Sequence, residues 1–419
     1  MRSTKRRTAL LAAAVPLLLI LAGCAGPGGS GDGGADPENA FKIGLLAPMT
    51  GFVSSIGTDI KQGWDYYWEQ NGTKVGKYEV VTKLEDDASD PDTSLNKAVR
   101  LVKEENVDVV VGPLLSNQGL AVADYLVQEG VPNFTLGSAD ELTQQRHNPL
   151  VLRTGIYSGS QMAFPGGQWA HDQGYKTAAT LCADYAFGWE SCGGFSSTFT
   201  AAGGKVTQQL WYPTDAADFS SYATQLLNSD ADVIFIGSAG GTDASNILRA
   251  ASDFGLLKKI PILTNCCTLD QATLQDVGDI ALGLNSVSPY AEGAPDISDF
   301  VTGFEKKYGV IPSAYAAGAY TTAQIIAATL AGMDTKVSGQ DFVDQVKSAD
   351  LSHSLWGPVT FDDYNNLVGR VFIREVVKRD DGKLWNVPIK TFDDVSQFWT
   401  FDPTEVIENG PFTPDWQGK

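Results

Sequence analysis

Histidine, cysteine and basic residues are all scarce in this chain, and each shortage excludes a class of function. Three histidines and five cysteines among 419 residues supply few metal ligands, and neither the CxxC nor the HxxxH spacing typical of zinc sites occurs. The histidines His147, His171 and His353 lie in polar stretches, and no GxSxG motif offers a nucleophile. We therefore expect no metal, no cofactor and no enzymatic activity.

The shortage of basic residues also bears on the partners of the protein. Lys and Arg number 30 against 50 Asp and Glu, so nucleic acid is not an expected partner. The acids are dispersed and 43% of the residues are hydrophobic, which indicates a folded protein rather than an acidic tail. The length predicts two domains.

The N-terminus carries the signals for export. Residues 1–7 contain four basic residues and no acid, and the apolar run 9–20 that follows is too short to span a bilayer. The run ends in LAGC, which resembles a bacterial lipobox and predicts a lipid on Cys24; the alternative is ordinary cleavage near Ala25. Residues 25–39, AGPGGSGDGGADPEN, form a flexible tether. These signals predict an extracytoplasmic protein anchored to the membrane through Cys24.

Four further cysteines allow three disulfide pairings outside the cytoplasm. We expect Cys182 to pair with Cys192, because a strand residue then meets the first turn of the next helix. The adjacent Cys266 and Cys267 form either a strained eight-membered disulfide or two free thiols.

From Phe41 onward, β-rich runs alternate with helical segments, which is typical of a parallel sheet with crossover helices. Nine strands are predicted, at residues 42–48, 79–86, 108–112, 131–137, 176–184, 205–212, 232–237, 260–265 and 283–290. The helices between them are amphipathic. The fold class is therefore α/β, with two doubly wound parallel-sheet lobes.

The alternation stops after Tyr290, where two helices precede a β-hairpin-like segment, so that the chain crosses between the lobes three times. The predicted parts are a signal peptide (1–23), a lipidated tether (24–40), a first lobe, a second lobe, and an extension that packs on a lobe. The first lobe comprises 41–156 and 291–352, the second 157–290 and 353–390, and the extension 391–419.

One strand-turn-helix segment, DVVVGPLLSNQGLAVADYLVQEGVP at residues 108–132, ends its strand just before Ser116. Ser116 stands where a helix N-cap is expected. Its hydroxyl either caps the helix or, together with the free N–H groups there, binds a ligand. From this segment alone the cap is favoured.

The order and spacing of several segments resemble the extracellular solute-binding proteins of ABC importers, in the family of the leucine/isoleucine/valine-binding protein. The segments are PMTGFVSSIGTDIKQG, EDDASDP, VGPLLSNQGLAVADYLVQEGVP, DYAFGWE, DFSSYATQLLNSDADVIFIG and VTFDDYNNLVG. The resemblance covers Phe41 to about Pro388. It implies a type I periplasmic-binding fold, in which two lobes joined by three hinge strands close over a small solute.

The resemblance also implies where the solute would bind. Ser116 matches the serine that holds the ligand carboxylate beside backbone N–H groups, which favours the ligand role over the cap. The other positions carried over from the family are Ser55, Ile56, Asn117, Gly137, Ser138, Ala139, Tyr185, Phe187, Cys266, Tyr290 and Tyr315. For the aromatic side chains, ordinary core packing is the alternative.

The chain departs from family members that bind α-amino acids. The acid that pairs with the ligand ammonium falls at Cys266, the threonine that helps to hold the amino group at Ala139 or Ser138, and an aromatic residue at Ile56. An ammonium buried without a carboxylate would be strongly unfavourable. We therefore expect a small carboxylate or amide, aromatic or branched, although Asp184 or Asp270 could replace the missing acid.

Two further motifs have simple structural interpretations. The turn GSAGGTDASN at residues 237–246 lacks a complete phosphate-binding pattern and is expected to be a tight turn in the cleft of the second lobe. The acidic run EDDASDPD at residues 85–92 lacks the DxDxDG calcium pattern and is expected to be a solvated strand end.

The resemblance therefore predicts a monomeric, lipid-anchored solute receptor that docks on ABC permease subunits. The alternatives are a receptor for branched-chain or other α-amino acids, and a ligand sensor that presents its solute to a membrane signalling receptor.

Overall fold

The computed structural model describes residues 39–416 except residue 215. These residues belong to one compact unit. The predicted signal peptide, Cys24, nearly all of the tether and the last three residues of the extension lie outside the described residues, so lipidation of Cys24 stays a prediction. Within the described residues, no helix has both the length and the apolar character needed to cross a bilayer.

The first lobe is built on a six-stranded sheet with the order β2-β3-β1-β4-β5-β6, parallel except for β2. The strands are β1 (Ala40–Ala47), β2 (Lys74–Val75), β3 (Tyr78–Asp86), β4 (Val109–Val111), β5 (Asn133–Thr135) and β6 (Val151–Arg153). The helices are α1 (Ser54–Asn71), α2 (Pro91–Lys103), α3 (Ser116–Gln128) and the short η1 (Asp140–Thr143). Every residue of the three-valine β4 is buried, as expected for a strand with both faces covered.

The second lobe contains an eight-stranded sheet with the order β12-β13-β11-β10-β9-β7-β8, and β14 pairs with β13. Its strands are β7 (Thr177–Ala183), β8 (Lys205–Tyr212), β9 (Val233–Gly237), β10 (Ile262–Thr264), β11 (Asn285–Ser288), β12 (Thr360–Phe361), β13 (Leu367–Lys378) and β14 (Leu384–Val395). Its helices are α4 (Gly159–Asp172), α5 (Ala186–Ala201), α6 (Ser220–Leu227), α7 (Thr242–Asp253), α8 (Leu256–Lys259), α9 (Gln271–Val277) and η2 (Gly278–Ala281).

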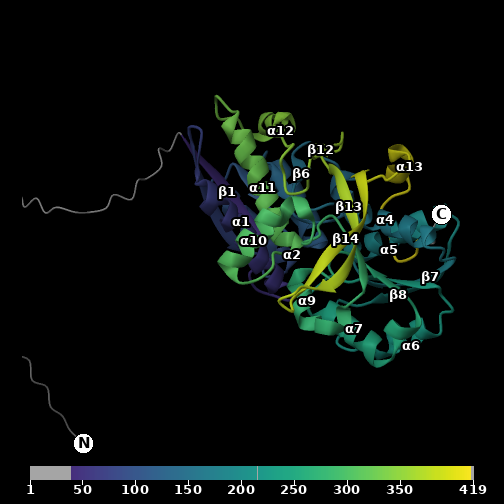
Figure 1. The fold of residues 1–419 in the computed structure, drawn as a ribbon. Coiled ribbons are helices and arrows are strands. Elements are labelled where there is room, and N and C mark those ends of the chain that lie inside the picture. The colour runs from purple at the N-terminus through teal and green to yellow at the C-terminus, as the bar shows by residue number, and fades with distance from the viewer. Residues whose placement is uncertain (1–38, 215, 417–419) are drawn as a thin grey trace, which may run out of the picture. The chain divides into compact units, whose positions relative to one another are not determined.

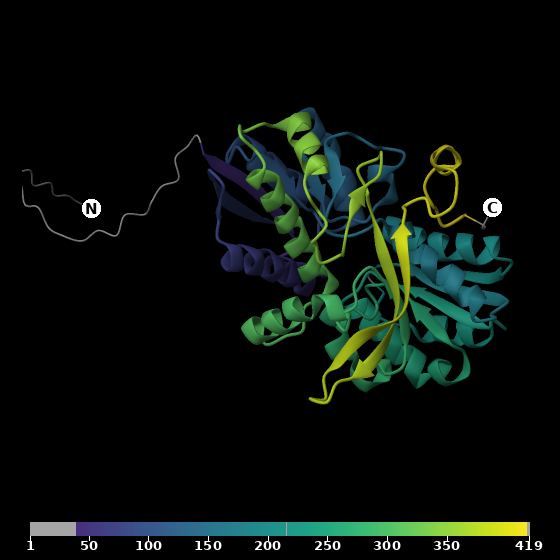
Figure 2. The same cartoon turned by 45° about the horizontal axis from the view of Figure 1, so that its top comes forward.

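The remaining elements are η3 (Pro295–Ile297), α10 (Ser298–Tyr308), α11 (Ala314–Ala331), α12 (Gly339–Ser348) and α13 (Pro403–Glu408). The chain leaves the first sheet after β6, returns after β11 to pack α11 on α1, and crosses again after α12. The predicted class, two parallel-sheet lobes with three crossings, is confirmed. Figures 1 and 2 show the first lobe in purple-blue with the green helices α11 and α12, and the second lobe in teal with β13 and β14 in yellow along its sheet.

Two strands of the first sheet were absent from the sequence prediction. The three residues of β6 and the two of β2 are too short to show an alternating pattern. The hairpin-like segment forms β13 and β14, and β14 continues to Val395. In the second sheet β7 to β11 pair in parallel, whereas β12, β13 and β14 are joined by antiparallel pairing.

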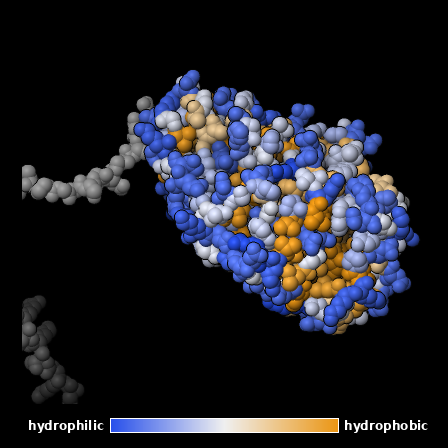
Figure 3. All heavy atoms as spheres, viewed as in Figure 1, coloured by the Kyte–Doolittle hydropathy of each residue, from blue (hydrophilic) through white to orange (hydrophobic). Residues whose placement is uncertain are grey.

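The predicted disulfide between Cys182 and Cys192 is confirmed, with 6.2 Å between the Cα atoms. Cys266 and Cys267 are free thiols, so of the two alternatives the structure contains the second. On the surface, the face in Figure 3 is mostly polar, and apolar side chains gather over the second lobe.

Candidate functional site between the lobes

A small cavity lies where the two lobes meet. Its lining comes from the carboxyl ends of strands and the helices that follow, the usual place for ligand sites in α/β sheets. The lining residues are Ile56, Leu114, Leu115, Ser116, Ser138 and Tyr315 from the first lobe, and Tyr185, Phe187, Ala239 and Cys267 from the second. The cavity has a volume of about 20 Å³, room for about one water molecule. The lobes are therefore closed on each other.

The wall of the first lobe is built around the start of α3. The N-cap of α3 is Leu115, whose N–H donates to Oε1 of Gln118 at 3.2 Å, so the expectation that Ser116 occupies the N-cap position is wrong by one residue. The serine hydroxyl takes no part in capping the helix. The Ser116 side chain is buried, and its hydroxyl has no hydrogen-bond partner. A buried polar group at a helix N-terminus is thus available for a polar ligand.

The wall of the second lobe is aromatic and contains one thiol. Tyr185 and Phe187 lie at the start of α5, with their ring centroids 6.2 Å apart. The Tyr315 hydroxyl, from α11, donates across the cavity to Sγ of Cys267 at 2.8 Å. This bond joins the two lobes directly.

The cavity lining carries no formal charge, because none of its residues is Asp, Glu, Lys, Arg or His. The two candidate counter-charges are elsewhere. Asp184 is exposed and accepts a hydrogen bond from Nε1 of Trp189. Asp270 is buried outside the lining, where it caps α9 and accepts from the backbone N–H of Ala314 at 3.0 Å. Neither acid faces a ligand in this cavity.

Two buried arginines hold the loops behind the cavity. Arg153 donates to the carbonyl oxygens of Gly137 and Ala139, on either side of the cavity residue Ser138. Arg374, on β13, donates to the carbonyl of Cys266 at 2.7 Å, next to the cavity residue Cys267. Each lobe therefore fixes one cavity loop through backbone contacts from behind.

Two carboxyl groups from different lobes influence each other electrostatically. Burial raises the pKa of Asp59, on α1, to about 7, while a hydrogen bond from Ser313 lowers it and the nearby Asp270 raises it further. Asp270 belongs to the second lobe, and its own pKa is raised by burial and lowered by Arg374. The closed lobes thus bring two carboxyl groups together, and Asp59 is uncharged below about pH 7.

Six of the predicted ligand residues lie around this cavity, namely Ile56, Ser116, Ser138, Tyr185, Phe187 and Tyr315. The other six do not line it. Ser55 and Asn117 are exposed, and the carbonyls of Gly137 and Ala139 accept from Arg153 behind the cavity. Cys266 faces Met162, and Tyr290 donates to the carbonyl of Pro312. Their predicted roles as ligand contacts have no support from this geometry.

The sequence interpretation missed four lining residues. Leu114 and Leu115 precede Ser116, and Cys267 follows the predicted Cys266 by one position. Ala239 belongs to the turn that was assigned to the cleft without a ligand role. Their places in the sequence could have identified them, since all four adjoin a predicted ligand residue or lie in the turn that was predicted to face the cleft.

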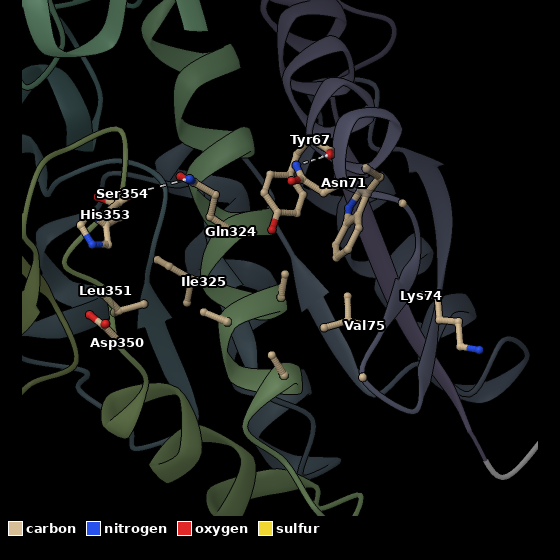
Figure 4. Close-up of a pocket in the computed structure, with 16 residues that line it drawn as sticks. Tyr67, Asn71, Lys74, Val75, Gln324, Ile325, Asp350, Leu351, His353 and Ser354 are labelled. Carbon is tan, nitrogen blue, oxygen red and sulfur yellow. Dashed lines mark hydrogen bonds between the residues drawn. The ribbon is translucent and has the colours of Figure 1, made fainter. Parts of the chain in front are cut away.

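Larger hollows lie away from the lobe interface. One of about 460 Å³ on the first lobe lies between the end of α1, the turn at Lys74, α11 and the loop at His353 (Figure 4). Another, of about 390 Å³, lies between α5 and the C-terminal extension, which packs Phe412 and Trp416 together near α5. Neither combines residues from facing strand ends of both lobes, so size alone does not identify the solute site.

The acidic run at residues 85–92 stabilises local structure through hydrogen bonds. Asp86 accepts from the backbone and hydroxyl of Thr50, and Asp90 caps α2 by accepting from the N–H of Thr93 at 2.8 Å. Across the described part of the chain, no three His, Cys, Asp or Glu side chains are grouped so that they could hold a metal ion.

Comparison with known proteins identifies relatives that span nearly the whole folded region. The family described as Periplasmic binding protein matches residues 40–383. A Leu/Ile/Val-binding protein homologue from Brucella abortus (strain 2308) is 28% identical over 365 residues, 85% of this chain and 92% of the relative.

Solved structures resemble the chain over a similar range. The ABC transporter substrate-binding protein from Sphaerobacter thermophilus has a TM-score of 0.81 and 26% identity, and the match covers 85% of this chain and 99% of that one. A solute-binding protein of an ABC transporter from Rhodopseudomonas palustris BisB5, in complex with 3,4-dihydroxybenzoic acid, has a TM-score of 0.79 and 28% identity. That match covers 86% of this chain and 99% of the other.

Proposed function

This chain belongs to the periplasmic binding protein family and is a solute-binding protein of an ABC transporter, and we propose that its solute is a small aromatic or branched carboxylate, or the related amide. The observation that carries the proposal is the uncharged cavity with one buried, unpartnered hydroxyl, that of Ser116. The relatives are substrate-binding proteins rather than enzymes, and the family acts outside the cytoplasm.

The charge of the cavity distinguishes this proposal from binding of an α-amino acid. A carboxylate can be held by the Ser116 hydroxyl and the N-terminus of α3, which favours negative charge. An ammonium group would have no carboxylate in the lining, and an isolated buried charge is disfavoured by several kcal/mol. Branched-chain or other α-amino acids are therefore the second candidate.

The apolar wall supports an aromatic or branched body for the solute. Tyr185, Phe187 and Tyr315 supply aromatic faces, and Ile56 and Leu114 supply aliphatic ones. Flat rings pack well between such side chains. The Rhodopseudomonas palustris protein, solved with a dihydroxybenzoic acid, shows that a relative of this size accepts an aromatic carboxylate.

Binding requires the lobes to separate. The cavity of about 20 Å³ is far smaller than the roughly 300 Å³ of a typical ligand pocket. We infer that the solute reaches the cavity when the lobes rotate apart about the three crossings and that the lobes close around it. The closed form, as a monomer, then docks on the permease.

The test is a thermal-shift panel on the purified protein. The panel contains benzoate, hydroxybenzoates, branched carboxylates, their amides, leucine, isoleucine, valine and sugars. A ligand at 100 times its Kd stabilises the fold by about 2.7 kcal/mol, which raises Tm by a few degrees. A shift with carboxylates or amides and none with the amino acids supports the proposal. A shift with α-amino acids alone contradicts it.

We further propose that a lipid on Cys24 anchors the protein to the membrane. Replacement Cys24→Ser is expected to move the protein from the membrane fraction to the soluble fraction after cell breakage. An unchanged distribution contradicts the anchor.

Uptake measurements distinguish import from sensing. Deletion of the neighbouring permease genes abolishes accumulation of the labelled solute only if the protein serves import.

A further inference from the structure

Two adjacent thiols lie in the turn that follows β10. Cys266 and Cys267 are both buried, and their Sγ atoms are 3.3 Å apart. In a strand, successive side chains point to opposite faces, whereas this turn brings the two sulfur atoms into contact, although Cys267 lines the cavity and Cys266 does not. The only other cysteines in the described residues, Cys182 and Cys192, form a disulfide, so the chain is one that carries oxidised thiols.

The side chains of Arg374 and Asn265 hold this arrangement. The Arg374 guanidinium donates to the Cys266 carbonyl at 2.7 Å. On the N-terminal side, Nδ2 of Asn265 donates to the Ser238 carbonyl at 2.9 Å, and Oδ1 of Asn265 accepts from the Thr268 hydroxyl at 2.8 Å. Contacts on both sides of the pair therefore fix the turn and keep the sulfur atoms in contact.

We propose that Cys266 and Cys267 form a redox modification site, in which an extracytoplasmic disulfide donor joins them into an eight-membered ring in the wall of the solute cavity. The Cys267 thiolate attacks one sulfur of the donor disulfide, which forms a mixed disulfide and releases one donor thiol. The Cys266 thiolate then attacks the Cys267 sulfur and expels the second donor thiol. The two cysteines lose two electrons and two protons, and the donor disulfide is reduced to two thiols.

The cleft controls when this exchange occurs. The hydrogen bond with Cys266 and burial raise the pKa of the Cys267 thiol well above its usual range, so the thiol stays protonated while the lobes are closed. Since the thiolate is the nucleophile, exchange proceeds when the lobes open and Cys267 meets solvent. Cys267, the member of the pair that lines the cavity, is the one that a donor reaches first.

The consequence rests on the proposed function of the same cavity. In the reduced protein, the Tyr315 hydroxyl donates to Cys267 Sγ at 2.8 Å and bridges the space that the solute must occupy. Ring closure draws that sulfur toward Cys266 and breaks the bridge between the lobes. Oxidation therefore loosens the closed, empty form and enlarges the cavity on the Cys267 side.

The ring is also expected to be the more reducible of the two disulfides. Adjacent Cα atoms are about 3.8 Å apart, below the about 4.4–6.8 Å usual for a disulfide, and such deviations make the bond easier to reduce. The Cα atoms of Cys182 and Cys192 are 6.2 Å apart, within that range. Mild reductant should open the ring first.

The test uses the full-length protein treated with oxidised glutathione or with a low concentration of dithiothreitol, then quenched in acid, labelled with a maleimide and digested. After oxidation, the peptide with Cys266 and Cys267 is expected to carry no label and to weigh two hydrogens less. After mild reduction, it should carry two labels while Cys182 and Cys192 stay joined. Two labels after oxidation, or stable glutathione adducts, would overturn the proposal. Cys266→Ser should trap the glutathione adduct on Cys267.

A second measurement tests the lobe bridge without any ligand. Tyr315→Phe is expected to lower the Tm of the reduced protein by about 1–2 °C, because it removes one hydrogen bond, and to leave the oxidised protein unchanged. Equal shifts in both states would show that the ring leaves the bridge intact and would overturn this part. Since neither measurement needs a solute, their failure is distinguishable from failure of the proposed solute class.

Discussion

Replacement Ser116→Ala is expected to weaken solute binding without weakening the fold. The Ser116 hydroxyl is 2% exposed and has no partner in the closed, empty cavity. A hydrogen bond to a charged group contributes about 1.5–3 kcal/mol, and each 1.4 kcal/mol is about tenfold in Kd. A carboxylate should therefore bind about 10- to 150-fold more weakly to the variant, whereas an amide, with a neutral bond of about 0.5–1.5 kcal/mol, should lose only about 2- to 10-fold.

The stability of the empty protein should respond in the opposite direction. Alanine removes a buried hydroxyl that has no hydrogen bond, so the free energy of unfolding should stay the same or rise by up to about 1 kcal/mol. Ser196→Ala is the matched control, because Ser196 is also buried and unpartnered but lies on α5 outside the cavity. Isothermal titration and urea unfolding of both variants measure the two quantities. Equal affinity in Ser116→Ala and wild type, or equal losses in the two variants, would refute the reasoning.

Three further predictions concern the lobes and their cores. The pKa of Asp59 is about 7 in the folded protein, above its usual value, so the folded protein keeps the carboxyl proton at a pH where the unfolded chain has lost it. The free energy of unfolding should therefore fall as pH rises from about 4 to 7. Asp59→Asn should remove part of this pH dependence when Tm is measured against pH. Arg374→Met leaves three buried acceptors unpaired and should lower the free energy of unfolding by about 3–5 kcal/mol in urea; a loss below about 1 kcal/mol contradicts this. A Cβ at Gly63 would lie 2.0 Å from the carbonyl oxygen of Ala316, so Gly63→Ala should lower the free energy of unfolding by about 1–3 kcal/mol. Gly332→Ala is the control, because a Cβ there would lie 3.7 Å from its nearest neighbour and should change stability little. Similar Tm values for both variants would argue against tight packing of α1 on α11.

Sequence periodicity was sufficient for the two-lobed fold because the long strands and helices carry repeating burial patterns. It failed for β6, whose three residues show no alternation. In the loops, the ligand-facing residue could be predicted only to within one position. The family resemblance pointed to Cys266, but Cys267 lines the cavity, and nothing local distinguishes two identical neighbours. Tyr290 was equally ambiguous, since only the packed hinge shows that its ring meets Trp356.

The N-cap of α3 also could not be inferred from the local sequence. A serine before a helix predicts an N-cap in most proteins. Here Gln118, three positions beyond Leu115, accepts the N-cap N–H and also donates to Asp87, a residue from a different strand end. A cap that depends on a partner 31 residues away cannot be inferred from the local sequence.

The buried arginines behind the cavity hold the conformation of the binding loops independently of the loop side chains. Arg153 and Arg374 grip main-chain carbonyls, which every residue type possesses. Substitutions at Ser138 or Cys267 therefore exchange the chemistry facing the solute while the loop keeps its course. Single point mutations can therefore change the ligand specificity of such a scaffold. For the same reason, a biosensor for another small acid could be designed by varying these two positions without rebuilding the loops.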